Sequence, residues 1–404
     1  MSKLELNYEE FKEILKKERT PCALVNLDAL DENSSRILSF VKGTGKTVRV
    51  ASKSIRSPWI LDYIFKIDST YKGIMSFTVE EANFLADGGR DNILVAYPTV
   101  QQSDMELIAE MTGRGVNVSL IVDSEEHLEA LGSIGRKKGV IINAVVELDV
   151  SLRRLKHTIH VGARRSPVRD AGRVISLYRY AEKIGGVKII GVMGYEAHVA
   201  GVPDSNPFTR ALNPVAKILK KISCPDVARQ RLDLMDTLHK HGIKLELVNG
   251  GGTGSLMSTP SERAVTEVTV GSGFYCPHLF SYYQGLILIP AAFFALQIVR
   301  SSDPRYVTCL GGGYVASGAA RADKLPIPYS PPGLQVLPME GAGEVQTPLK
   351  LPKNVPPLSL GDPVIWRHAK AGELMERFNE VLLIRNGEIV GRVPTYRGLG
   401  KCFL

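Results

Sequence analysis

The chain has 404 residues and 44% hydrophobic content, which suffices to bury a large core and predicts two or three domains. No apolar run is long enough to span a bilayer, and the charged N-terminus lacks the apolar core of a signal peptide, so we expect a cytoplasmic protein without a membrane partner. The net charge of +8 is spread along the chain, which argues against a nucleic-acid partner and fits a small anionic ligand. The five cysteines are scattered without a C-x-x-C pair, which argues against a disulfide framework or a zinc knuckle.

Strand-like and helical segments alternate along most of the chain. A strand at 22–27 leads into a helix from Asp28 to about Val41. Eight strand-like runs follow, and helical stretches separate most of them. The runs are 46–53, 73–77, 93–97, 117–123, 142–150, 188–198, 245–252 and 267–274. Eight alternating units predict a closed parallel (β/α)8 barrel of the α/β class, with an open doubly wound sheet as the competing fold.

The remaining segments predict additions to the barrel. The stretch 208–241 is longer than one crossover helix, and we expect two helices there, on the barrel rim. Beyond Gly285 the chain is rich in Gly, Pro and short apolar runs, and Asn386-Gly387 between two such runs predicts a hairpin. The Pro-rich stretch 325–337 indicates a loop. The predicted units are an N-terminal segment 1–30 that packs with the β domain, a cofactor-binding barrel over 31–284 and a C-terminal antiparallel β domain over 285–404.

Active sites of parallel barrels lie at the carboxyl ends of the strands, so the residues that end each strand are candidates. The first strand ends on Lys53, and lysine amines form Schiff bases with carbonyl cofactors when burial lowers their pKa. Arg153 follows the fifth strand, where its guanidinium can bind a phenolate or a carboxylate. Tyr195 ends the sixth strand and can stack on a planar ring. On local grounds alone, a solvated lysine, a surface ion pair and a core aromatic are the competing interpretations.

Glycine-rich loops end the last two strands. Three consecutive glycines weaken a strand, and bare N–H groups beside hydroxyls form an anion nest. Barrels often bind phosphate after strands seven and eight. The residues that predict a phosphate site are Gly251, Gly252, Thr253, Gly271, Ser272 and Gly273. Two ordinary glycine turns are the competing interpretation.

The order of these motifs resembles the fold-type III pyridoxal-phosphate enzymes, members of the alanine racemase barrel superfamily. The matching motifs are Arg49 and Lys53 on the first strand, Asp149-x-x-x-Arg153, Gly191-x-x-x-Tyr195 and Gly251-Gly252-Thr253. Within this family the chain is more similar to the D-threonine aldolase and D-serine dehydratase branch than to the alanine racemases. The resemblance covers nearly the whole chain and is strongest from Thr20 to Phe274.

The resemblance implies roles for the candidate residues. Lys53 would hold pyridoxal 5′-phosphate as a Schiff base, with Arg153 near the phenolic oxygen of the cofactor and Tyr195 against its pyridine ring. The two glycine-rich loops would hold its phosphate. The family is commonly homodimeric, with the β domain of one subunit completing the site of the other.

One place departs from the family pattern. The aldolase and dehydratase branch carries a metal-binding histidine followed two residues later by Cys or Asp, whereas this chain reads His368-Ala369-Lys370. Lysine is a poor ligand because it must lose its proton to bind, which puts a divalent metal in doubt. His368 is then a catalytic proton-transfer group, or binds metal with Glu373 or Glu376. Lys370 alternatively fixes a substrate carboxylate.

Three functions compete on these observations. The leading hypothesis is a lyase for D-configured β-hydroxy amino acids that performs retro-aldol cleavage or β-elimination of water. The second is an amino-acid racemase that uses Lys53 and Tyr314 as bases on opposite faces of the cofactor. The third is a non-catalytic carrier of the cofactor, against which the C-terminal domain argues.

Overall fold

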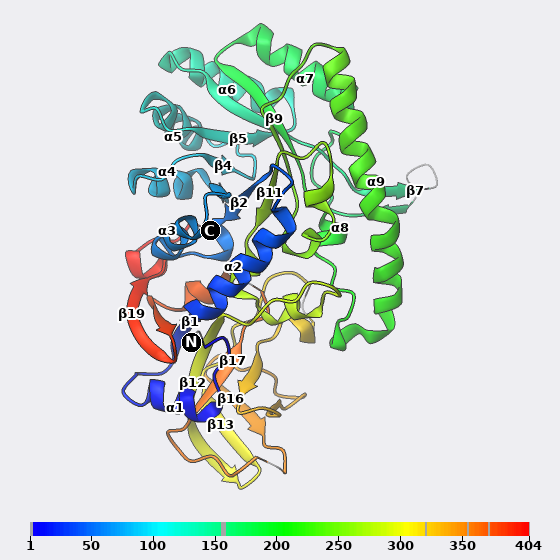
Figure 1. Ribbon diagram of the computed structural model, residues 1–404. Helices are drawn as coiled ribbons and strands as arrows, with labels where there is room; N and C mark the ends of the chain where they lie inside the picture. The colour runs from blue at the N-terminus through cyan, green and yellow to red at the C-terminus, as the bar shows by residue number, and fades with distance from the viewer. Residues whose placement is uncertain (1–2, 155–158, 320, 354, 371, 404) are drawn as a thin grey trace.

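The computed structural model describes residues 3–154, 159–319, 321–353, 355–370 and 372–403. Two parts are visible in Figure 1, a barrel wrapped by helices and a β-sheet that contains strands from both ends of the chain. No helix in the described ranges combines the length and the apolar character that crossing a membrane requires.

Eight parallel strands close into a barrel in the order β10-β11-β2-β3-β4-β5-β6-β9. Their bounds are β2 Thr47–Ala51, β3 Tyr71–Ser76, β4 Ile93–Val95, β5 Val118–Val122, β6 Ile142–Glu147, β9 Val187–Gly194, β10 Leu247–Gly250 and β11 Glu267–Val270. Each strand overlaps one of the eight predicted runs. The closed barrel is therefore confirmed, and the open doubly wound sheet is wrong.

Helices cover the outside of the barrel (Figure 1). Their bounds are α2 Leu27–Val41, α3 Pro58–Ile67, α4 Val79–Asp87, α5 Gln102–Gly113, α6 Glu125–Lys138, α7 Ala171–Ile184 and α9 Asn213–Lys240. Two short helices, α8 Ala197–Ala200 and α10 Ser272–Tyr275, follow β9 and β11 at the carboxyl ends of the strands. Local sequence sets these limits: Ser124 caps the start of α6 by accepting a hydrogen bond from the His127 N–H, and Gly139 ends the helix with a φ of 70°.

The expectation of two helices over 208–241 is wrong, because α9 is one continuous helix of 28 residues. Pro225 lies inside it, where a proline removes one backbone hydrogen bond but need not end the helix. Buried side chains on the C-terminal side of the proline, among them Val227 and Leu234, belong to the main hydrophobic core. Packing thus holds the helix together across a residue that disfavours it.

The second part is a nine-stranded sheet. Its strands are β1 Cys22–Asn26, β12 Ala292–Asp303, β13 Tyr306–Leu310, β14 Ile327–Ser330, β15 Gln335–Val336, β16 Gln346–Lys350, β17 Pro363–Arg367, β18 Glu380–Arg385 and β19 Glu388–Pro394. All neighbours are antiparallel except β1 and β18. Strand β1 lies between β12 and β18, and helix α1 (Tyr8–Leu15) packs Phe11 against Phe293 at 5.7 Å between ring centroids. The N-terminal segment is therefore part of this sheet.

Two predictions about loops in the sheet had different outcomes. The hairpin between β18 and β19 is confirmed, since Asn386 and Gly387 both have positive φ values, 52° and 84°. The expected loop at 325–337 is wrong, because it contains β14 and β15. Proline is tolerated in β14 because that strand pairs on one side only, with β17.

A buried ion pair lies where the first and last barrel strands meet. Arg49 on β2 donates to Glu267 on β11 at 2.5 Å, and Asn249 on β10 donates to the same carboxylate at 2.7 Å. All three residues are buried, so each polar group depends on the others for its partners. These contacts link β2, β10 and β11, the strands that precede Lys53 and the two glycine-rich loops.

Candidate active site

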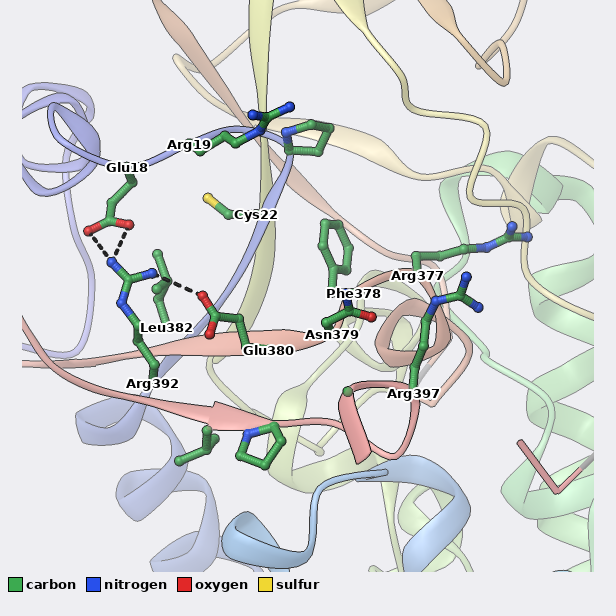
Figure 2. Close-up of a pocket in the computed structure, with 14 residues that line it drawn as sticks. Glu18, Arg19, Cys22, Arg377, Phe378, Asn379, Glu380, Leu382, Arg392 and Arg397 are labelled. Atoms are coloured by element: carbon green, nitrogen blue, oxygen red, sulfur yellow. Dashed lines mark hydrogen bonds and ion pairs between the residues drawn. The ribbon is translucent and has the colours of Figure 1, made fainter. Parts of the chain in front are cut away.

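A cavity of about 810 Å³ lies on the sheet. Figure 2 shows an ion-paired side, where Arg392 bridges Glu18 and Glu380, and an opposite side that carries Arg377 and Arg397. None of the predicted site residues lines this cleft. Size alone therefore does not identify the active site.

A smaller cavity, about 410 Å³, opens at the carboxyl ends of the barrel strands. This volume suits a small-molecule site. The predicted residues that line it are Lys53, Tyr195, Gly251, Gly252, Thr253, Gly271 and Ser272. The structure thus brings together residues that lie up to 219 positions apart in the sequence, and the barrel mouth is the candidate active site.

Lys53 lies in the turn η1 (Ser52–Ser54) directly after β2. Its ammonium donates a hydrogen bond to the Tyr97 hydroxyl at 2.6 Å. The Arg165 guanidinium lies 5.7 Å from the ring centroids of both Tyr97 and Tyr195. Burial of Tyr97 opposes its ionisation, but the charges of Lys53 and Arg165 outweigh burial and lower its pKa. The Lys53 ammonium therefore favours the ionised form of the neighbouring Tyr97 phenol.

The two glycine-rich loops lie close to the surrounding backbone. Gly251 has a φ of +92°, and a Cβ on Gly271 would lie 2.5 Å from the Ser54 hydroxyl. The Gly273 N–H donates to the Thr253 hydroxyl at 2.9 Å and joins the loops. Thr253 opens the turn η3 (Thr253–Ser255) and Ser272 opens α10, and both residues line the cavity. The first N–H groups of a helical turn have no acceptor inside the turn, so N–H groups at a bare backbone suit an anion.

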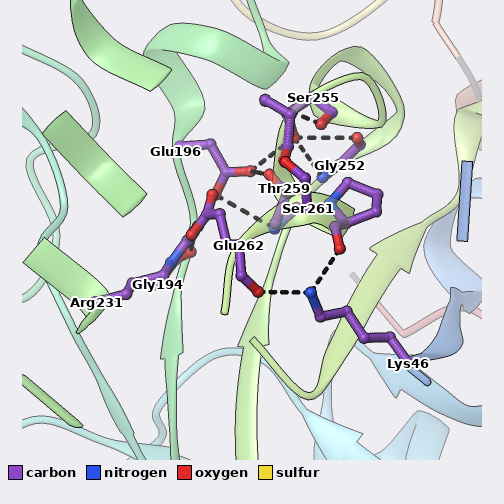
Figure 3. A network of polar contacts seen from close by, with 12 residues as sticks. Lys46, Gly194, Glu196, Arg231, Gly252, Ser255, Thr259, Ser261 and Glu262 are labelled. Atoms are coloured by element: carbon purple, nitrogen blue, oxygen red, sulfur yellow. Dashed lines mark hydrogen bonds and ion pairs between the residues drawn. The ribbon is translucent and has the colours of Figure 1, made fainter. Parts of the chain in front are cut away.

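A buried network beneath the β10 loop fixes its shape (Figure 3). Glu196 accepts hydrogen bonds from the hydroxyls of Ser255 and Thr259, each at 2.6 Å, and from the Gly251 N–H at 3.2 Å. Its carboxylate also pairs with Arg231, which holds Glu262 in turn. Burial opposes the ionisation of Glu196, but Arg231 and the hydroxyl donors outweigh burial and lower its pKa. The charged carboxylate thus orders the loop from below.

Four predicted residues do not line the cavity. Arg153 pairs with Asp149 at 2.6 Å, and the arginines that do line the cavity are Arg56 and Arg165. Gly273 lies behind Thr253, which it contacts. Tyr314 packs against Phe294 and Phe378 with ring centroids 5.0 and 5.7 Å apart. His368 is buried outside the lining.

The described residues around His368 do not form a metal site. Neither ring nitrogen has a hydrogen-bond partner among the described residues. Burial, with nearby His278 and Arg367, lowers its pKa to about 3. Within the described ranges, no three His, Cys, Asp or Glu side chains gather in an arrangement that could hold a metal ion. Lys370 and Glu373, by contrast, line the cavity.

Sequence reasoning missed Tyr97 and Arg165 as site residues. Tyr97 ends the third predicted strand run, so the strand-end rule would have found it. Arg165 lies in a long loop between β8 (Ile159–Val161) and α7, where no spacing or periodicity marks it.

Known proteins resemble this chain both in sequence and in fold. A family model described as alanine racemase, N-terminal domain, matches residues 25–278. The 3-hydroxy-D-aspartate aldolase of Paracoccus denitrificans (strain Pd 1222) is 23% identical over 257 residues, which cover 63% of this chain and 59% of that protein. The D-threonine aldolase of Arthrobacter sp is 23% identical over 253 residues, which cover 63% of this chain and 60% of that protein. The chain thus matches about three fifths of the length of these relatives.

Solved structures match over nearly the whole chain. D-threonine aldolase from Filomicrobium marinum gives a TM-score of 0.80 at 18% identity and covers 94% of this chain and 95% of that one. A metal-free cysteine-to-alanine mutant of D-threo-3-hydroxyaspartate dehydratase gives 0.73 at 18% identity, with coverages of 95% and 98%. An alanine racemase of Clostridium difficile 630 gives 0.62 at 16% identity, with coverages of 93% and 99%. These likenesses show a shared fold, and the match of the family model to residues 25–278 shows that the chain belongs to the alanine racemase N-terminal domain family.

Proposed function

We propose that the protein is a pyridoxal 5′-phosphate-dependent lyase that acts on D-configured β-hydroxy amino acids. The observation that carries the proposal is that Lys53 and the two glycine-rich loops line the same cavity at the barrel mouth. Relatives named 3-hydroxy-D-aspartate aldolase, D-threonine aldolase and D-threo-3-hydroxyaspartate dehydratase support the reaction class.

The residues of the cavity fit pyridoxal phosphate. Lys53 offers an amine for the cofactor aldehyde, and the loops at Thr253 and Ser272 offer backbone N–H groups for its phosphate. Tyr195 offers an aromatic face, and Arg165 a guanidinium for an anionic oxygen. When bound, the cofactor supplies an electron sink for negative charge at the substrate α carbon.

The side chains of this chain have three tasks in the proposed reaction. Lys53 anchors the cofactor and exchanges a proton with the Tyr97 hydroxyl, 2.6 Å away. Arg165, against both tyrosine rings, takes the role that the family pattern gave to Arg153. Glu196 holds the phosphate loop from below through Gly251 and Ser255. A catalytic role for His368 remains a prediction, since its ring does not line the cavity.

Product analysis with purified protein tests the function. D-threonine and D-threo-3-hydroxyaspartate are offered in separate assays, with the L isomers as controls. An aldehyde with glycine indicates retro-aldol cleavage, whereas a keto acid with ammonia indicates dehydration. If the cofactor-loaded protein forms neither product but inverts the α carbon, the racemase hypothesis replaces the lyase. Unchanged amino acids would leave only a carrier of the cofactor.

We also propose a homodimer in which the sheet of one subunit completes the site of the other. The measurement is the solution mass by light scattering. A monomer that retains full lyase activity would contradict this arrangement.

A further inference from the structure

A loop from the sheet part of the chain lies directly over the barrel mouth. Lys370 and Glu373, which follow β17, line the same cavity as Lys53. Gly372 has a φ of +96°, and a Cβ at this position would overlap the carbonyl oxygen of Lys53. Only glycine fits this contact, because other residues combine a strained φ with a collision against backbone. The loop is thus fixed beside the proposed cofactor lysine.

The loop carries two charged groups that are not fully paired within the described residues. Lys370 is exposed and forms no ion pair with any described residue. Glu373 accepts a hydrogen bond from the Ser317 N–H at 2.8 Å through Oε1, while its buried Oε2 has no hydrogen-bond partner among the described residues. A buried carboxylate oxygen without a donor is costly, so it indicates a place for a ligand donor.

The cavity as a whole is cationic. Its lysines and arginines are Lys53, Arg56, Arg165 and Lys370, against a single described carboxylate, Glu373. Glu376 neutralises Arg56 from outside the lining. This balance favours ligands with several negative charges, such as a phosphate together with a dicarboxylate.

The same residues do not fit a divalent metal ion. The family pattern pairs a histidine with a second ligand two residues later, and Lys370 occupies that second place. A protonated ammonium has no lone pair to donate, and it repels a cation. His368 lies outside the lining, and no ligand cluster surrounds it in the part of the chain that the structure describes.

We propose that Lys370 supplies the positive charge that a divalent metal ion supplies elsewhere in the family, and that Lys370 and Glu373 together bind a substrate side chain that ends in a carboxylate. Lys370 attracts the distal carboxylate, and Glu373 Oε2 accepts a hydrogen bond from the β-hydroxyl. The substrate class is then a β-hydroxy dicarboxylic amino acid, which rests on the proposed function. The site is independent of metal.

Ligand binding to the cofactor-loaded protein tests the role of Lys370 without turnover. D-aspartate carries the distal carboxylate but lacks a β-hydroxyl, and D-2-aminobutyrate has an uncharged side chain of similar length. Calorimetric titration is expected to show tighter binding of D-aspartate. The preference is the ratio of the dissociation constant for D-2-aminobutyrate to that for D-aspartate. In Lys370→Met this ratio should fall about tenfold or more, the effect of losing one charge-assisted hydrogen bond. Lys370→Arg should restore most of it.

The matched control is Lys353→Met, which removes an exposed lysine that does not line the cavity. It is expected to keep the preference for D-aspartate. If Lys370→Met leaves the affinity for D-aspartate unchanged, or weakens both ligands equally, the proposed role of Lys370 is wrong. Because D-aspartate cannot undergo the lyase reaction, a failure of the proposed function appears in the product assay and not in this titration.

Titration with Mn²⁺, monitored by electron paramagnetic resonance, tests whether the site binds a divalent metal ion. The dialysed wild-type protein is expected to bind no stoichiometric Mn²⁺, and a chelator should leave the affinity for D-aspartate unchanged. One tightly bound equivalent of Mn²⁺, or loss of D-aspartate affinity in the chelator, would overturn the proposal.

Discussion

Replacement of Arg231 by methionine should uncouple the glycine-rich loop after β10 from its support. The guanidinium lies between Glu196 and Glu262, and the three side chains are 1%, 2% and 6% exposed. Arg231→Met keeps the aliphatic stem but leaves two buried carboxylates without their counter-ion. Breaking a buried ion pair in this way costs about 3–5 kcal/mol of folding free energy.

The loss of folding free energy in Arg231→Met should depend on pH, because the substitution changes the pKa of Glu196. In the wild-type protein the pKa of Glu196 is lowered, so its stabilisation is present above the ordinary glutamate value and is lost as the pH falls through the lowered value. In the variant, burial without Arg231 raises the pKa of the same carboxyl, which then takes up a proton in mild acid. The difference in stability between the two proteins should therefore be largest at neutral pH and shrink in acid.

Urea unfolding of both proteins at several pH values measures this difference, and fluorescence titration measures their affinity for pyridoxal phosphate. The matched control is Arg392→Met, which removes an arginine that is 47% exposed and also bridges two glutamates, Glu18 and Glu380. Exposed pairs contribute at most about 1 kcal/mol. If Arg231→Met costs no more than this control, or binds pyridoxal phosphate as well as the wild type, the support role of the network is refuted.

Three further changes test the geometry of the barrel mouth. Gly372→Ala should displace the loop from the Lys53 carbonyl, lowering the melting temperature and any turnover together, and a variant with normal turnover would contradict the close contact. Lys53→Ala should raise the pKa of the Tyr97 phenol, because burial then acts without the opposing ammonium; ultraviolet titration against Tyr97→Phe identifies that phenol, and an unchanged pKa would exclude the coupling. Gly271→Ala places a methyl group 2.5 Å from the Ser54 hydroxyl and should weaken cofactor binding about tenfold or more, measured by equilibrium dialysis, whereas unchanged affinity would remove this loop from the site.

Local patterns sufficed for the barrel because each strand and its following helix are set by periodicity over short stretches. The pairing of strands that lie far apart in the sequence was harder to predict. Strand β1 joins β12 and β18 through hydrogen bonds that span more than 260 residues, and no local signal predicts the parallel pairing with β18. Helix α9 continues through Pro225 because tertiary packing overrides local propensity.

In the candidate site, too, local patterns identified some residues, and others depend on long-range contacts. Strand ends and glycine runs indicated Lys53, Tyr195 and the two glycine-rich loops, because barrel topology brings the ends of all strands to one face. Arg165 enters the cavity from a long loop, and its position depends on contacts with Tyr97 and Tyr195 that sequence spacing does not encode. The unpaired oxygen of Glu373 is likewise a property of the folded chain.

Borohydride reduction followed by peptide mass spectrometry tests the central claim most directly. The protein is saturated with pyridoxal phosphate, reduced and digested, and each lysine peptide is examined for the reduced cofactor. The proposal predicts one adduct, on the peptide that contains Lys53, and none in Lys53→Ala. An adduct on a different lysine, or a protein that binds no pyridoxal phosphate, would contradict the assignment of the barrel mouth as the cofactor site.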